Sequence, residues 1–199
     1  MSGQITHRFC GRAQTLNRSV KGAQFFLDVL TTMSNIPSMP SALFVVFGNT
    51  ALRHLQARIR ERNLGHLVTF AGYGELQADV YPAMDVAILT SSTEGLSISL
   101  LEAMAWGLPV VATAVGGNSE IVQHGYTGYL VKHGDADAFA EHLVTLTKEP
   151  DLCWRLGDAG RKTVSERFDV NRVAEEYSAL YEGLASQTVI RRKPGESPE

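Results

Sequence analysis

Two carboxylates stand eight positions apart in an otherwise apolar stretch, SSTEGLSISLLEAMAWGLPVVAT, which runs from Ser91 to Thr113. One glycine, two serines and four aliphatic residues separate Glu94 from Glu102. Two carboxylates could act as an acid–base pair. A carboxylate also accepts hydrogen bonds without donating any, which suits the hydroxyl groups of a ribose or a sugar and disfavours phosphate. By residue type and spacing alone, such glutamates are more often ordinary exposed residues of a loop and a helix.

The residues between the two glutamates predict an anion site. A helix is expected over 97–106, with Ser97 or Ser99 as its cap, directly after the predicted strand 85–90. The first amide groups of a helix have no partner within it and carry partial positive charge, so they attract phosphate. Gly95 allows the chain to approach a ligand closely. Because this terminus lies between the two carboxylates, we interpret them as hydroxyl-binding groups around a phosphate site and not as an acid–base pair. A sugar nucleotide has that layout.

The elements that position this stretch alternate between short apolar runs and longer amphipathic runs, which is typical of βαβ units. Parallel strands meet ligands at their carboxyl ends. We therefore predict an α/β fold with a Rossmann-like, doubly wound parallel sheet of about six strands and a helical C-terminal extension. The domain is expected over 4–186, with 187–199 as a disordered tail. Strands are predicted at 6–11, 42–48, 66–72, 85–90, 109–113 and 128–131, and helices at 22–33, 51–63, 97–106, 135–149 and 152–168, with a short one from Glu75 that Pro82 ends, an N-cap at Asp151 and a last helix from Asn171.

Composition limits the class of protein. The 199 residues, 44% hydrophobic and 20% charged, suit one soluble α/β domain. A net charge of −3 argues against nucleic-acid binding. No apolar run reaches the length of a signal peptide or a membrane span, and Cys10 and Cys153 form no CxxC motif, so we expect a cytoplasmic protein with reduced thiols. The six histidines show no HxxxH or HExxH pair, and no metal or cofactor is expected. Trp106 and Trp154 are predicted to be packing residues.

The two glutamates also frame an E-x7-E motif, EGLSISLLE, followed by A-x-G-L-P-V-V-A-T and GG-x-x-E-I-V. Together with FCGRA, LFVVFGN, VTFAGY and ADVYPAMDVAILTSS, these motifs resemble the C-terminal, nucleotide-binding domain of retaining GT-B glycosyltransferases of the glycosyl transferases group 1 type, the GT4 class. The resemblance extends over nearly the whole chain. It implies one half of a GT-B fold. It also implies a hexosyltransferase that moves a sugar from a UDP-, GDP- or ADP-sugar with retention of configuration, in polysaccharide or glycoconjugate biosynthesis.

The resemblance implies a role for each residue around the E-x7-E motif. Glu94 would bind hydroxyls of the donor sugar, and Glu102 the ribose of the nucleotide. The amide groups from Gly95 through Leu96 to Ser97 would face the diphosphate and complete the donor-sugar site. Ser99 would lie on the nucleotide side.

The resemblance also implies roles for further residues, which are matched to the family by their order along the chain. Arg12 and Lys21 would bind the phosphates and, with Glu94, make up the catalytic set, because they stabilise charge on the leaving diphosphate without a metal. The loop AQTLNRSV between the two basic residues is long, which leaves Arg18 as a rival to Lys21. The base would contact the loop after the third strand at Tyr73, Gly74 and Leu76. The turn at Gly116 and Gly117 suits a structural role as well as ligand contact.

Enzymes of this family have a second, N-terminal domain that binds the acceptor. The resemblance therefore implies that this chain is the donor-binding half and that the acceptor domain is missing from it, so the isolated domain would be inactive or weakly active. Peripheral membrane association would occur only through the missing half. One alternative is a non-catalytic subunit that binds a nucleotide sugar and pairs with a separate N-terminal-domain partner. A related GT-B epimerase or phosphorylase is another, although no context marks the pyridoxal-phosphate lysine that a phosphorylase needs.

Overall fold

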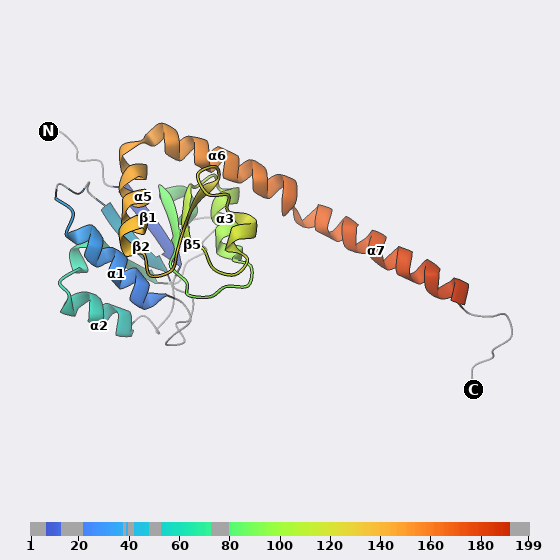
Figure 1. Cartoon of the computed structure of the whole chain (residues 1–199), viewed down its shortest axis with the longest axis horizontal. Coiled ribbons are helices and arrows are strands. Elements are labelled where there is room, and N and C mark those ends of the chain that lie inside the picture. The colour runs from blue at the N-terminus through green and yellow to red at the C-terminus, as the bar shows by residue number, and fades with distance from the viewer. Residues whose placement is uncertain are drawn as a thin grey trace.

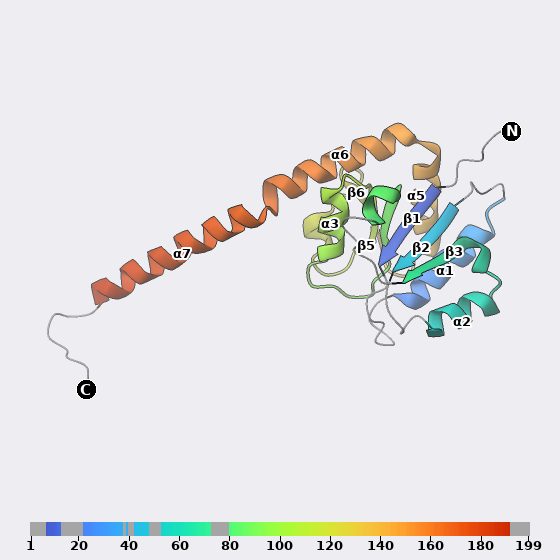
Figure 2. The ribbon, with the colours of Figure 1, turned by 180° about the vertical axis from the view of Figure 1, so that it is seen from behind.

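The fold is built on a six-stranded parallel sheet with the strand order β3-β2-β1-β4-β5-β6 (Figures 1 and 2). The computed structural model describes residues 7–12, 22–37, 39, 42–47, 53–72 and 80–191, with the backbone alone at 7–12, 47, 72 and 187–191. The strands are β1 (His7–Arg12), β2 (Ala42–Phe47), β3 (Val68–Gly72), β4 (Val86–Leu89), β5 (Val110–Thr113) and β6 (Gly128–Val131). The predicted doubly wound sheet is confirmed.

Helices follow the strands in the alternation that the sequence predicts. They are α1 (Ala23–Ser34), α2 (Arg53–Glu61), α3 (Ile98–Ala105), α4 (Asn118–Ile121), α5 (Ala136–Lys148), α6 (Pro150–Arg167) and α7 (Val170–Arg191), with short 3-10 turns at η2 (Gly65–Leu67) and η4 (Tyr81–Ala83). In the part of the chain that the structure describes, no helix combines the length and apolar character needed to cross a membrane.

The sheet separates two apolar cores, because successive side chains of a strand point to opposite faces. In β2, Phe44 and Val46 join a core with the buried residues of α1, α2 and α5, whereas Val45 joins a second core with those of α3 and η4. In β4, Ile88 and Ala87 divide in the same way. Both faces of β4 are therefore buried, which is why its sequence is continuously apolar.

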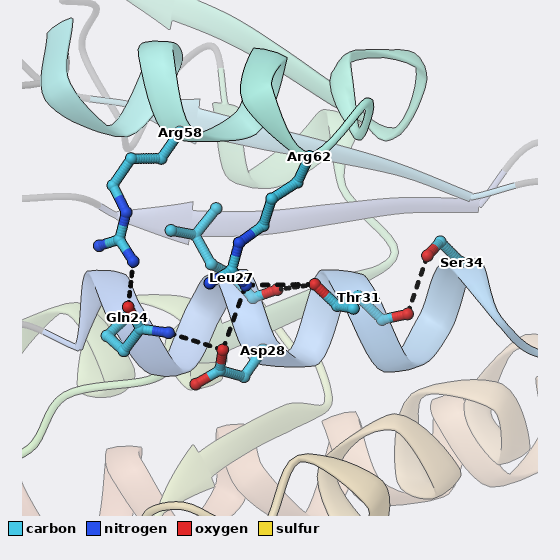
Figure 3. A network of polar contacts seen from close by, with 7 residues as sticks. All are labelled: Gln24, Leu27, Asp28, Thr31, Ser34, Arg58 and Arg62. Carbon is cyan, nitrogen blue, oxygen red and sulfur yellow. Dashed lines mark hydrogen bonds and ion pairs between the residues drawn. The ribbon is translucent and has the colours of Figure 1, made fainter.

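Polar side chains fasten α2 to the outer face of α1, as Figure 3 shows. Arg62 forms an ion pair with Asp28, with 3.3 Å between Nη1 and Oδ1, and the same nitrogen donates to the hydroxyl of Thr31 at 3.3 Å. Arg58 donates to the amide oxygen of Gln24, whose nitrogen in turn donates to Asp28 at 2.7 Å. These groups are largely exposed, so they set the position of α2 more than they stabilise the fold.

The C-terminal helices behave differently from each other. α6 packs closely on the end of α3, since a Cβ placed on Gly157 would lie 1.9 Å from the carbonyl oxygen of Gly107. α7 projects away from the sheet in both views (Figures 1 and 2), and all its residues from Val170 to Ser186 are exposed. The Asp169 carboxylate accepts bonds from the first amide groups of α7, at 2.9 and 3.2 Å, and so caps this helix.

Four local features differ from the sequence-based predictions or lie partly outside the described residues. Most of the helix expected from Glu75 lies outside the described residues; its described end is Val80 and the 3-10 turn η4, which contains Pro82. Asp151 is not an N-cap, since α6 begins at Pro150, a residue suited to the first turn of a helix. Packing roles for Trp106 and Trp154 are wrong, because these side chains are 48% and 73% exposed. α7 continues to Arg191, past the expected start of the tail, and the domain bounds themselves stay a prediction.

Candidate functional site

The winding of the sheet reverses between β1 and β4, which are neighbours in the middle of the strand order. The connection after β1 leads to α1 on one face, and the connection after β4 leads to α3 on the other. In open α/β sheets, ligands bind at the carboxyl ends of the strands beside such a reversal. Glu94 lies in the connection after β4 and therefore stands at the expected position for a ligand.

The start of α1 touches the end of β4 through backbone atoms. Gly22 has φ of 65° and precedes α1, and a Cβ there would lie 1.5 Å from the carbonyl oxygen of Thr90. The Thr90 hydroxyl donates to the Gly22 carbonyl at 3.3 Å. Only glycine fits both the left-handed backbone and this contact. The two loops beside the reversal are thus held at van der Waals distance.

The Glu94 loop is fixed from two sides. On one side, the buried hydroxyl of Ser91 donates to Glu94 Oε1 at 2.7 Å. On the other, the turn after β5 presses against it, since a Cβ on Gly116, where φ is 51°, would lie 1.7 Å from the Glu94 carbonyl oxygen. Gly117 N–H donates to the Gly95 carbonyl at 2.7 Å. The two glycines therefore have a structural role here, and the position of the Glu94 carboxylate follows from these contacts.

The start of α3 offers uncapped amide groups beside Glu94. Ser97 occupies the N-cap position, as expected, but its side chain makes no capping hydrogen bond. Its hydroxyl instead lies 3.1 Å from that of Ser99. Leu96 and Ile98 are 43% and 58% exposed around this terminus. A helix start that its own side chains leave uncapped can bind an anion.

Glu102 is held by a tyrosine that sequence analysis did not assign to the site. The Tyr81 hydroxyl donates to Glu102 Oε2 at 3.0 Å and lies 3.4 Å from the Ser99 carbonyl oxygen. Tyr81 is 2% exposed and belongs to η4, which packs on α3. In the sequence it stands beside Pro82 within an expected helix, so no local signal marked it.

The remaining expected site residues are only partly described. Arg12 ends β1, at the same edge of the sheet as Glu94, and its backbone alone is described. Lys21, its rival Arg18, and the loop with Tyr73, Gly74 and Leu76 lie outside the described residues. Among the described side chains, no three histidine, cysteine, aspartate or glutamate residues gather as metal ligands would.

Two side chains with shifted pKa values, Cys153 and His142, lie away from the carboxyl ends of the strands. Cys153 donates its thiol to the Leu146 carbonyl at 3.0 Å, and burial raises the pKa of this thiol to about 11. It is therefore a protonated, unreactive group at neutral pH, in agreement with a packing role. His142 stacks on Tyr129 with ring centroids 4.0 Å apart. Burial is the main cause that lowers the pKa of His142, and the nearby His124 lowers it further.

Comparison with known proteins gives consistent matches. The model of the family described as glycosyl transferases group 1 matches residues 6–149. The chain is 30% identical over 165 residues to an N-acetyl-alpha-D-glucosaminyl L-malate synthase of Bacillus anthracis, which covers 82% of this chain and 42% of the relative. It is 35% identical over 144 residues to the putative glycosyltransferase EpsD of Bacillus subtilis, covering 72% and 38%. A UDP-Gal:alpha-D-GlcNAc-diphosphoundecaprenol alpha-1,3-galactosyltransferase of Escherichia coli is 29% identical over 163 residues, covering 81% and 42%. The chain thus spans about two fifths of the length of these relatives.

Solved structures agree with the fold. A sucrose-phosphate synthase from Thermosynechococcus elongatus superposes with a TM-score of 0.80 at 28% identity, over 91% of this chain and 46% of that one. An Anabaena protein, HepE, described as a complex with UDP-glucose, superposes with a TM-score of 0.76 at 20% identity, over 89% and 49%. The C-terminal domain of LpcC from Francisella tularensis superposes with a TM-score of 0.68 at 24% identity, over 83% and 89%. For HepE and LpcC, which are 20% and 24% identical to this chain, the likeness concerns the fold alone.

Proposed function

Since this chain belongs to the glycosyl transferases group 1 family and forms one half of a GT-B fold, we propose that it is the donor-binding half of a glycosyltransferase. It binds a nucleoside-diphosphate sugar, and the sugar passes with retention of configuration to an acceptor held by a second domain. UDP is named for the Escherichia coli relative and for the Anabaena structure, so UDP-sugars are the first ligands to test.

One observation carries the proposal: the uncapped start of α3 lies between two carboxylates that are each held in place by a hydroxyl group. Ser91 occupies part of the Glu94 carboxylate, but a carboxylate has about four acceptor positions, so Glu94 can accept hydrogen bonds from ligand hydroxyls as well. Tyr81 orients the Glu102 carboxylate. A diphosphate at the helix start would then place a sugar at Glu94 and a ribose at Glu102.

Charge on the leaving diphosphate would be stabilised by cations from the first connection and by the α3 amide groups. Arg12 ends β1 next to β4, which supports its assignment to the phosphates. Lys21, or Arg18 in its place, would supply the second positive charge. These cations would do the work of a metal ion, so the reaction would need none.

A second candidate function is a non-catalytic subunit that pairs with a separate acceptor-binding partner. The observation that favours it is the row of exposed apolar residues on α7, which includes Val173, Tyr177, Leu180 and Leu184. Contiguous apolar surface of this kind is typical of an interface. Such a subunit would bind the same nucleotide sugar, so the binding test below applies to both candidates.

Calorimetric titration of the chain with UDP-glucose, UDP-N-acetylglucosamine, GDP-mannose and ADP-glucose tests the proposal. We expect at least one sugar nucleotide to bind. Glu94→Gln should weaken binding of that ligand about tenfold and change binding of the free nucleoside diphosphate less than about twofold, whereas Glu102→Gln should weaken both. Glu141→Gln, an exposed change on α5, is the control. If the folded chain binds none of the four ligands, the proposal is wrong.

A further inference from the structure

A chain of buried polar contacts runs beneath the Glu94 loop. The Thr113 hydroxyl, at the end of β5, donates to the Ser91 carbonyl at 2.7 Å. The Asn118 side-chain amide, at the start of α4, donates to the Thr113 carbonyl at 2.9 Å. Both side chains are 0% exposed. Ser91 links these contacts to the site, because its own hydroxyl donates to the Glu94 carboxylate at 2.7 Å.

The Thr113 hydroxyl connects the two chain segments just beyond the point where β4 and β5 stop pairing. β4 and β5 pair as far as Leu89 and Ala112, and the chain after β4 then leaves the ladder. The next contact between the two segments is the Thr113 hydroxyl on Ser91, which reaches across 22 residues of sequence. Together with the contact of Thr90 with Gly22, this hydrogen bond holds the first residues of the Glu94 loop.

The buried side chain of Asn118, which donates to the Thr113 carbonyl, also carries an energetic cost. Among the residues that the structure describes, its Oδ1 atom is buried without a hydrogen-bond partner, and an unpaired buried acceptor is destabilising. An apolar side chain would avoid this loss. The Asn118 amide and the backbone N–H of Val115, at 2.9 Å, both donate to the Thr113 carbonyl, so the end of β5 is held at a defined position.

We propose that Thr113 and Asn118 are positioning residues for the donor sugar. They fix Ser91, and through Ser91 they orient the Glu94 carboxylate, while neither side chain reaches the ligand itself. This inference rests on the proposed function, because it assumes that Glu94 binds the sugar. Loss of either side chain should therefore weaken binding of the sugar nucleotide more than binding of the nucleotide without its sugar.

Thr113→Val tests the inference, since valine keeps the shape and β-branching of threonine and removes the hydroxyl donor. The dissociation constant for the UDP-sugar should rise about five- to tenfold, whereas that for UDP should change less than about twofold. Thr113→Ser restores the hydroxyl and should recover the wild-type ratio of the two constants. Asn118→Leu, which removes the amide donor, should shift the ratio in the same direction and supports the test if Thr113→Val does not fold.

The outcomes separate the two proposals. If Thr113→Val and Asn118→Leu fold and weaken both ligands equally, or weaken neither, the positioning role is wrong and the proposed function stands. Recovery of the ratio by Thr113→Ser argues against a general packing effect, which serine, lacking the methyl group, would worsen. If the wild-type chain binds no UDP-sugar, the proposed function fails and this inference fails with it.

Discussion

Alanine at Gly116 should displace Glu94 and so weaken donor binding. The added Cβ would lie 1.7 Å from the Glu94 carbonyl oxygen, and side chains do not approach closer than 3.0 Å, so the two loops must separate by about 1.3 Å. A backbone shift of that size moves the carboxylate out of hydrogen-bonding reach of a bound sugar. A hydrogen bond to a charged group contributes about 1.5–3 kcal/mol, which corresponds to about ten- to one-hundred-fold in the dissociation constant for the UDP-sugar.

Gly125→Ala is the matched control for this change. Gly125 also has positive φ, 77°, but a Cβ there would meet nothing within 4 Å, so alanine adds backbone strain alone. We expect both variants to lose about 1–2 kcal/mol of unfolding free energy from that strain, measured by chemical denaturation, with a further loss in Gly116→Ala from the contact. Titration calorimetry should show weaker UDP-sugar binding in Gly116→Ala only. Unchanged binding in a folded Gly116→Ala would refute the assignment of Glu94.

Three further predictions concern packing, the nucleotide side and pH. Gly157→Ala should lower the melting temperature, because its Cβ would lie 1.9 Å from a carbonyl oxygen at the end of α3, whereas Gly160→Ala, with neighbours at 3.5 Å or more, should keep or raise it; equal effects would contradict this packing. Tyr81→Phe removes the hydroxyl that holds Glu102 and should weaken binding of UDP and UDP-sugar alike, by about five- to tenfold in calorimetry; an effect on the UDP-sugar alone would refute it. Burial lowers the pKa of His142, so its contribution to stability is complete above its unfolded pKa of about 6.5 and is lost as pH falls through the folded value. Melting temperatures from pH 7.5 to 5 should therefore fall less in His142→Phe than in wild type. Equal falls in the two proteins would contradict a lowered pKa of His142.

The strands were predictable because each carries a strong local signal. The six predicted strands match the observed ones within about two residues at each end, since both faces of β4 and β5 are buried and their sequences are continuously apolar. The end of α3 was also predictable, because Gly107, with φ of 75°, ends a run of helix formers. From this local pattern, the position of Glu94 at the carboxyl edge of the sheet followed directly.

What could not be predicted depends on contacts between distant segments. Thr113 and Ser91 are 22 residues apart, and Tyr81 and Glu102 are 21 apart, so neither pair leaves a periodic trace in the sequence. Trp154 was expected to pack, but it lies near the start of α6 with its side chain exposed. Apolar spacing predicts helices well, and it does not say which segment lies against them.

A crystal structure of this chain with the UDP-sugar that it binds most tightly would test the central claim most directly. We expect the diphosphate at the start of α3, sugar hydroxyls within about 3 Å of the Glu94 carboxylate and ribose hydroxyls within about 3 Å of Glu102. The Ser91 and Tyr81 hydroxyls should keep their contacts with the two carboxylates. A ligand bound away from the carboxyl edge between β1 and β4, or a sugar that does not contact Glu94, would contradict it.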